Sequence, residues 1–221
     1  MILKKYKKIV IKIGSTTIVD QLLGKIKTKW LNSICSDIAE LSITNKKIAV
    51  VSSGAIALGK YLISNNKPIK RLEDKQAAAA IGQIELAKHW QQGFKKYNIN
   101  TAQLLLTLND SEERRRYLNA RKTIISLHNK NVIPIINEND TVATEEIRYG
   151  DNDRLAARVA QMMGADLLIM LSDIDGLYTS NPYLDKQAKR VSNIKMVDEV
   201  IEKMVGKNQS VFGSGGMSTK I

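Results

Sequence analysis

The sequence has little of several residue types on which particular classes of protein depend. Its only cysteine is Cys35, so no disulfide can form within the chain. Aromatic residues make up 5% of the sequence, which leaves few rings to stack on unpaired nucleobases. The two histidines, His89 and His128, lie in helical patterns without catalytic neighbours, and we expect both to be structural. We expect Cys35 to be a buried, inert thiol, because it lies in a helical pattern over residues 30–41.

Two further absences narrow the class of protein. No apolar run approaches the roughly 20 residues of a membrane-spanning helix, and the basic opening segment is not followed by a small-residue cleavage site. We therefore expect a cytoplasmic protein without a membrane partner. The sequence also lacks the phosphate loop G-x-x-x-x-G-K-[ST] and the catalytic loop of protein kinases. These absences disfavour the common nucleotide-binding folds.

The chain is basic, with a formal net charge of +12 at pH 7. A positive surplus favours anionic ligands, among them nucleotides and nucleic acids. The lysines are scattered, however, and the one local cluster in the sequence joins Arg114-Arg115-Arg116 to Arg121-Lys122. Helix-turn-helix, zinc-finger and RNA-recognition motifs are missing. Nucleic acid is thus the less favoured partner, and a small anionic ligand is the more favoured one.

The order of apolar patterns predicts an α/β fold. With 221 residues, 43% of them apolar and 25% charged, the chain is long enough for one α/β domain with a substantial core. We expect strands at 9–13, 47–52, 101–107, 132–136 and 167–171. Helices are expected at 28–42, at 72–97 as one or two pieces, from a cap at Asp110 to about 131, and at 154–163. This alternation of near-continuous apolar strands with helices predicts a mainly parallel sheet covered on both faces.

Two blocks of polar residues lie next to loops at the ends of expected strands. The first is Asn137-Glu138-Asn139-Asp140, directly after a buried strand, and the second is Gly150-Asp151-Asn152-Asp153, before a helix. In open α/β sheets, ligands bind at the carboxyl ends of the strands. Carboxylates and amides accept hydrogen bonds from an ammonium group, and amide NH2 groups donate to a carboxylate. The mixture suits a zwitterion, which is a free amino acid.

A second interpretation of these blocks stays open. Asn, Asp and Gly also gather in turns for conformational reasons alone, and Asp153 could simply cap a helix. The recurrence of such a block beside one strand end favours the binding-site interpretation.

Lysines and glycines mark further strand ends and loops. Lys12 closes the first expected strand ahead of Gly14, Ser53-Gly54-Ala55 follows the second strand, and Ser214-Gly215-Gly216-Met217-Ser218-Thr219-Lys220 ends the chain. Glycines let backbone N–H groups approach a phosphate, and a helix beginning near Ser218 would direct its positive end at an anion. Two lysines, backbone donors and an amino-acid pocket together indicate phosphoryl transfer to a small molecule.

Six segments carry a resemblance to a known family. They are I-K-I-G-S, S-S-G-A-I-A-L-G, Y-L-N-A-R-K-T, I-N-E-N-D-T-V-A-T, Y-G-D-N-D-R-L-A and G-S-G-G-M-S-T-K. In this order they resemble the glutamate 5-kinases (gamma-glutamyl kinases) of the amino acid kinase family. The resemblance implies a three-layer α/β/α sandwich around a mainly parallel sheet. It also implies ATP-dependent phosphorylation of the side-chain carboxylate of L-glutamate, the first step of proline biosynthesis.

The resemblance also implies roles for individual residues. Ser53, Asp140 and Asn152 match residues that hold glutamate, with Asn137 and Asp151 in the same pocket. Lys12 and Lys220 match the lysines beside the transferring phosphoryl group, and Asp153 matches the carboxylate that orients them. Lys12, the pair Ser172 and Asp173, and the loop from Ser214 to Lys220 match nucleotide-binding segments. Ser172 and Ser214 stand where many relatives have threonine, a change that keeps the hydroxyl.

The expected chemistry agrees with this inventory of residues. A glutamate side chain, with a pKa of about 4.3, is already an ionised nucleophile at neutral pH and needs no general base. The reaction instead needs two anions to be aligned and their charge neutralised, which lysines and Mg²⁺ supply. We expect ATP and Mg²⁺ as cofactors, with no metal site built from protein ligands alone, because magnesium arrives on nucleotide phosphates. We further expect a homo-oligomer, with proline as a candidate feedback inhibitor.

The resemblance has two departures, both at the C-terminal end. The family's nucleotide lobe continues past the S-T-K loop, and many members then add an RNA-modification-type domain. We therefore expect residues 1–221 to be an amino acid kinase domain that is incomplete at its C-terminus, without that accessory domain and with low turnover. Three hypotheses stay open: an active metabolite kinase, a non-catalytic remnant that binds glutamate or proline, and a basic RNA-associated domain.

Overall fold

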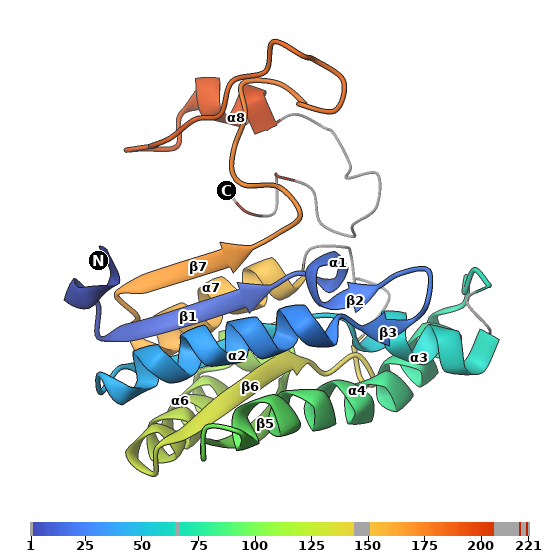
Figure 1. Ribbon diagram of the computed structural model, residues 1–221, viewed down its shortest axis with the longest axis vertical. Coiled ribbons are helices and arrows are strands. Elements are labelled where there is room, and N and C mark those ends of the chain that lie inside the picture. Colours follow the sequence, from blue (N-terminus) through green and yellow to red (C-terminus); the bar gives the residue numbers. More distant parts are fainter. Residues whose placement is uncertain (1, 65–66, 144–150, 206–216, 218–219, 221) are drawn as a thin grey trace.

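The main sheet has five parallel strands in the order β5-β6-β4-β1-β7 (Figure 1). The computed structural model describes residues 2–64, 67–143, 151–205, 217 and 220. The strands of the main sheet are β1 Lys8–Ile13, β4 Lys47–Ser52, β5 Asn100–Leu106, β6 Val132–Glu138 and β7 Leu167–Leu171. A short antiparallel pair, β2 Val19–Asp20 and β3 Lys25–Ile26, lies beside the main sheet. All five expected strands are confirmed, and so is the mainly parallel sheet.

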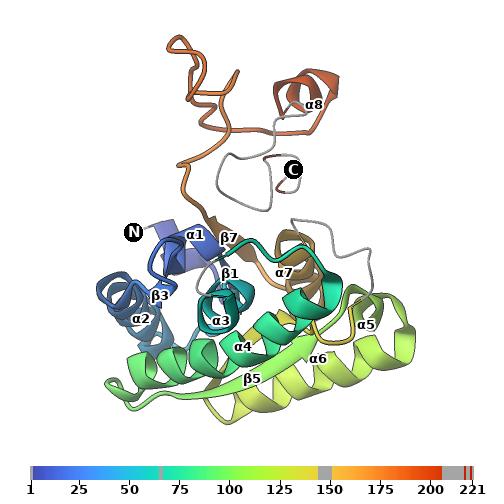
Figure 2. The ribbon, with the colours of Figure 1, turned by 90° about the vertical axis from the view of Figure 1, so that its right-hand side faces the viewer.

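Helices cover both faces of the sheet, as the side view shows (Figure 2). They are α1 Ser15–Ile18, α2 Thr28–Ile43, α3 Ala55–Ser64, α4 Leu72–Lys95, α5 Leu108–Glu112, α6 Arg114–Asn129, α7 Asp151–Met163 and α8 Glu199–Val205, with a 3-10 helix η1 at Ile2–Lys5. Helices α2 and α4 pack on one face and α6 and α7 on the other. The expected three-layer α/β/α sandwich is confirmed.

Strand alternation divides the apolar core into two layers. Side chains two residues apart share a face of a strand, so Ile9 and Ile11 of β1 lie in the layer under α2 and α4. Val10, between them, lies in the layer under α6 and α7. In the first layer, Trp90 and Phe94 of α4 stack with ring centroids 5.8 Å apart. The same alternation decides which helix each polar residue faces at the strand ends.

The predicted helices differ from the observed ones in a boundary and in several short elements. Asp110 does not cap one long charged helix, so that prediction was wrong. Thr107 caps the short helix α5, and its hydroxyl accepts from the Asp110 N–H while the Asp110 carboxylate accepts from the Thr107 N–H, which forms a capping box. Glu113 is extended, so helix α6 begins anew at Arg114. Helices α1, α3 and α8, the 3-10 helix η1 and the β2–β3 pair were not predicted.

Two other predictions concern the single cysteine and membrane-spanning helices. Cys35 is fully buried in α2, and burial raises the pKa of its thiol to about 12 although Lys96 acts in the opposite direction. The expected burial of Cys35 is confirmed, and it supports the expected inertness because an un-ionised thiol is a poor nucleophile. In the part of the chain that the structure describes, none of the helices combines the length and apolarity needed to span a membrane.

Candidate functional site

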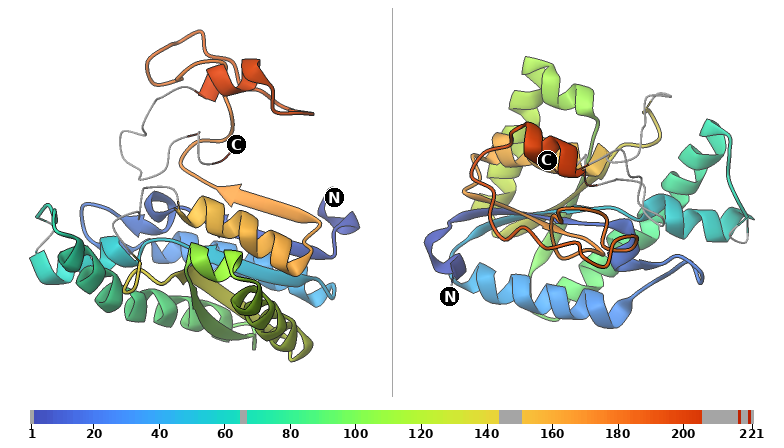
Figure 3. Two further views of the ribbon diagram at one scale, coloured as in Figure 1. Left: turned by 180° about the vertical axis from the view of Figure 1, so that it is seen from behind. Right: turned by 90° about the horizontal axis from the view of Figure 1, so that it is seen from above.

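The candidate site lies at the carboxyl edge of the sheet, where three neighbouring strands end together. Strands β6, β4 and β1 are adjacent and parallel, and their ends carry Asn137, Ser53 and Lys12. The β1 arrowhead points toward α1 and the β2–β3 pair in Figure 1, and the segment after β7 lies above this edge in Figure 3. The alternation of β1 directs Lys12 toward α7, whereas that of β6 directs Asn137 toward α4. The edge therefore collects polar side chains from both layers.

A glycine shapes the turn after β4. Gly54 has a φ of +116°, a conformation that L side chains rarely adopt, and a Cβ there would lie 2.9 Å from the Val19 side chain. The turn allows α3 to begin at Ala55 and leaves Ser53 at the edge, where its N–H donates to the Ile13 carbonyl. The backbone at this point thus holds the Ser53 hydroxyl next to the ends of β1 and β6.

A buried carboxylate joins two lysines from opposite ends of the sequence. Asp153, in the first turn of α7, is 1% exposed. Its Oδ1 lies 2.5 Å from the Lys12 ammonium and its Oδ2 lies 3.0 Å from the Lys220 ammonium. The three side chains together carry one net positive charge. Because they are largely withdrawn from water, their attraction for an anion is stronger than it would be on the surface.

A hydrogen-bonded network of three amides and one hydroxyl lies beside this cluster. The Asn152 amide NH2 donates to the Ser53 hydroxyl at 2.9 Å and to the Asn137 side-chain oxygen at 3.1 Å. The Asn137 NH2 in turn donates to the Gln83 side-chain oxygen at 2.7 Å. We call these four residues, Ser53, Asn152, Asn137 and Gln83, the amide network. Since Asn152 precedes Asp153 in α7, the amide network and the lysine cluster share one helical turn.

Gln83 belongs to this network but was missed in the sequence. It lies on α4 within a buried stripe that includes Gly82 and Leu86, and it is 8% exposed. A Cβ on Gly82 would lie 1.9 Å from the Ala55 carbonyl oxygen, so only glycine allows α4 to approach α3 this closely. The available signal was a glutamine inside an otherwise small and apolar helical stripe, because buried polar side chains need partners.

The other predicted site residues fall into two groups. Asp140 is half-buried two residues beyond β6, while Ser172, directly after β7, donates its hydroxyl to the exposed Asp173 carboxylate at 3.0 Å. Of the C-terminal loop, Met217 and Lys220 are described, and Asp151 is described as the first residue of α7 without its side chain. The remaining predicted nucleotide-binding residues lie outside the described residues: Ser214, Gly215, Gly216, Ser218 and Thr219.

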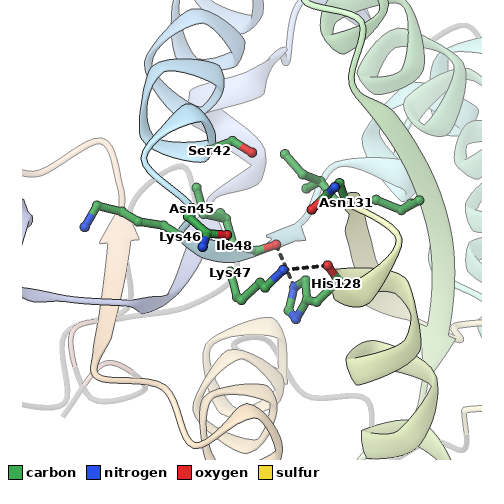
Figure 4. A pocket seen from close by; sticks show the side chains of 9 residues that line it. Ser42, Asn45, Lys46, Lys47, Ile48, His128 and Asn131 are labelled. Atoms are coloured by element: carbon green, nitrogen blue, oxygen red, sulfur yellow. Dashed lines mark hydrogen bonds between the residues drawn. The ribbon is translucent and has the colours of Figure 1, made fainter.

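Both histidines make local contacts away from this edge. His89 lies 2.7 Å from the Glu85 carbonyl oxygen through its Nδ1, within one turn of α4. His128 is buried near the start of β4, and its Nε2 lies 3.0 Å from the Ile48 carbonyl oxygen (Figure 4). Burial lowers the pKa of His128, which favours the neutral ring. These contacts support the structural roles expected for both side chains.

Comparison with known proteins places this fold in one class. The sequence matches the amino acid kinase family over residues 7–221. The structure resembles a UMP kinase from Bacillus anthracis, with a TM-score of 0.59, 17% identity, and coverage of 84% of this chain and 72% of that one. It also resembles an isopentenyl phosphate kinase from T. acidophilum, with a TM-score of 0.57, 14% identity, and coverage of 82% and 76%. The chain belongs to the amino acid kinase family.

Curated sequences give a narrower similarity. The chain is 57% identical to a glutamate 5-kinase from Allorhizobium ampelinum over 219 residues, which is 99% of this chain and 56% of the relative. It is 56% identical to a glutamate 5-kinase from Sinorhizobium fredii over the same share of both chains. The chain therefore spans about half the length of the curated relatives it matches.

Proposed function

We propose that this chain transfers the γ-phosphoryl group of ATP to the side-chain carboxylate of L-glutamate, forming L-glutamyl 5-phosphate for proline biosynthesis. One observation carries the proposal. The lysines Lys12 and Lys220 converge on Asp153, and the neighbouring residue Asn152 belongs to the amide network. A cationic cluster suited to a phosphoryl group thus adjoins polar groups suited to an amino acid. Relatives named glutamate 5-kinase at 56–57% identity support the choice of substrate.

In this proposal the two lysines stabilise negative charge on the transferred group, and Asp153 positions the two lysines. Lys12 and Lys220 stabilise the negative charge that spreads over the transferred group, because their ammonium groups are fixed before the reaction begins. Asp153 holds both ammonium groups from one buried carboxylate. An oxygen of the glutamate carboxylate forms the new bond to phosphorus, the bond to the ADP oxygen breaks, and ADP leaves with that electron pair. No proton has to be removed from the acceptor.

The ammonium group of the substrate would be bound by the amide network and by Asp140. The Asn152 Oδ1 is buried and lacks a hydrogen-bond partner among the described residues, so an ammonium group would satisfy it. Asp140 adds the charge that makes such a hydrogen bond strong. Ser53 and Asn137 complete the proposed pocket through their bonds to Asn152.

A magnesium ion fits this arrangement as a companion of the nucleotide. Mg²⁺ is commonly held by one or two carboxylates together with substrate phosphates. Within residues 2–64, 67–143, 151–205, 217 and 220, no three His, Cys, Asp or Glu side chains gather into a metal site. Both Asp153 oxygens contact ammonium groups, so the exposed Asp173 carboxylate would be the one that holds the ion together with the phosphates. When bound, the ion would neutralise phosphate charge; the nucleotide would further contact Ser172, Asp173 and the segment from Ser214 to Lys220.

Acceptor specificity tests the proposal. ADP release from ATP should depend on L-glutamate and should be at least tenfold slower with L-aspartate, N-acetyl-L-glutamate or UMP at equal concentration. N-acetylation removes the ammonium group and so leaves buried acceptors unpaired. Equal release with N-acetyl-L-glutamate or UMP would reject L-glutamate as the substrate. Calorimetric binding of L-glutamate without any ADP release would instead identify a non-catalytic amino-acid-binding protein.

A further inference from the structure

The amide network has a direction. Each Asn or Gln amide has one donating end and one accepting end. Asn152 donates to Asn137, which forces Asn137 to present its NH2 to the other side, where the Gln83 oxygen accepts it. Turning Asn152 by 180° would bring its oxygen against the Asn137 oxygen. The three amides are therefore coupled, and they can reverse only together.

The direction determines what the two ends of the network offer. At one end, the Asn152 Oδ1 is buried and has no hydrogen-bond partner among the described residues. At the other end, the Gln83 Nε2 is in the same situation. Ser53 does not set the direction, because a hydroxyl donates as readily as it accepts. In the observed direction Asn152 presents an acceptor, and in the reverse direction it would present a donor.

Gln83 lies on a helix that is fixed to the core. Its helix packs against α3 at backbone contact through Gly82, and the next turns bury Leu86 and Trp90 completely. Trp90 also donates its indole N–H to the Ser52 hydroxyl at 2.9 Å, which fixes α4 to the end of β4. The position of Gln83 thus comes from the core rather than from the loops at the edge.

We propose that Gln83 is a positioning residue that sets which atom Asn152 presents to the amino-acid substrate. By accepting from Asn137, Gln83 maintains the direction in which Asn152 offers its oxygen. An oxygen accepts from an ammonium group, whereas an NH2 group would leave that ammonium without a partner. The consequence for substrate binding rests on the proposed function; the coupling of the three amides does not.

Two substitutions of Gln83 test whether this side chain maintains the direction of the amide network. Gln83→Glu keeps an acceptor facing Asn137, and its ionised carboxylate cannot donate, so it should maintain the observed direction. Gln83→Met has similar length and neither donates nor accepts well, so Asn137 and Asn152 become free to turn. Gln91→Met, at an exposed position of the same helix, is the matched control.

The first measurement needs no substrate. The NMR signals of the Asn137 and Asn152 side-chain NH2 groups should shift and exchange faster with solvent in Gln83→Met, but stay close to those of the parent in Gln83→Glu and Gln91→Met. Unchanged signals in Gln83→Met would overturn the proposal. If Gln83→Met does not fold, Asn137→Asp serves instead: it still accepts from Asn152 but cannot donate to Gln83, so the Gln83 signals should move. Unmoved Gln83 signals would then overturn the proposal.

The second measurement concerns the substrate. Gln83→Met should raise the KM for L-glutamate about tenfold, because one buried hydrogen bond to a charged group is lost, while the KM for ATP stays within about twofold. Equal increases in both KM values would overturn the positioning role. If the parent chain shows no response to L-glutamate but the amide signals move as expected, Gln83 still positions Asn152 and the proposed function fails instead.

Discussion

The two edges of the sheet use similar side chains in different ways. At the carboxyl edge, Lys12 and Lys220 meet the Asp153 carboxylate, a contact between side chains. At the amino edge, the Lys46 ammonium donates to the Tyr6 carbonyl and the Lys47 ammonium donates to the His128 carbonyl. Figure 4 shows the second of these bonds. Carbonyls at the end of a helix lack partners within the helix, and cations stabilise them there. The amino-edge lysines thus complete the fold, whereas the carboxyl-edge lysines are arranged around another side chain.

The same difference holds for other polar groups. At the amino edge, the Asp166 carboxylate accepts from the backbone N–H groups of Lys7 and Lys8 at 2.8 and 2.9 Å, and these bonds lower its pKa. At the carboxyl edge, buried polar atoms of Gln83 and Asn152 have no hydrogen-bond partner among the described residues. Buried groups of this kind cost stability unless a ligand satisfies them. This comparison makes the carboxyl edge the candidate for ligand binding.

The largest expected effect comes from the carboxylate that both lysines share. Asp153→Ala should lower kcat for ADP release at least 1000-fold, because two like charges would then repel each other where the phosphoryl group is transferred. It should also lower the free energy of unfolding by about 3 kcal/mol, since it leaves two partly buried ammonium groups without their carboxylate. Steady-state kinetics and urea unfolding measure the two effects.

The matched control lies at the other edge. Asp166→Asn changes a carboxylate that contacts only backbone N–H groups in the described residues, so kcat should stay within about twofold of the parent. A similar loss of activity from both substitutions would show that the two edges do not differ as described.

An intermediate effect is expected at the amino-acid end of the site. Asp140→Ala should raise the KM for L-glutamate by about 30-fold, because the substrate ammonium would lose a charged acceptor. The KM for ATP should change little, which initial rates at varied concentrations of each substrate would show. A parallel rise in the KM for ATP would point to general misfolding and would remove Asp140 from the proposed pocket.

Local patterns were sufficient to predict the strands but not the pairing of distant groups. Strands β4 and β7 have the predicted bounds because near-continuous apolar runs leave no other placement. The split between α5 and α6 was missed because Thr107 competes with Asp110 for the capping position. The bond from Asn137 to Gln83 joins residues 54 positions apart, and no local period contains that information. The convergence of Lys12 and Lys220 was anticipated from the family resemblance, not from spacing.

The smallest expected effect concerns the amino edge and depends on pH. Burial lowers the pKa of His128 in the folded chain, with Lys47 and Lys8 adding to the shift. The unfolded chain, in which the histidine pKa is about 6.5, therefore binds more protons below that pH. The contribution of the neutral His128 ring to the stability of the folded chain is fully present above about pH 6.5. It is lost as pH falls through the folded-state pKa of His128.

A glutamine at this position separates titration from hydrogen bonding. His128→Gln keeps a donor for the Ile48 carbonyl but cannot titrate, so it should flatten the rise in stability toward neutral pH and cost about 1 kcal/mol or less at pH 7. Urea unfolding at several pH values provides the test, and activity at pH 7 should remain that of the parent. An unchanged pH dependence would show that His128 does not titrate as its burial requires.

The most direct test of the account is to trap the product of the proposed reaction. With ATP, L-glutamate and hydroxylamine present, an acyl phosphate is converted to a stable hydroxamate, which is measured together with ADP. We predict hydroxamate in equal amount to ADP, in proportion to the protein added however slow the turnover, and at least 100-fold less of both with Lys12→Met, which keeps the length of the side chain and removes its charge. ADP release that ignores L-glutamate, or equal hydroxamate from Lys12→Met, would contradict the assignment of glutamate phosphorylation to the carboxyl edge.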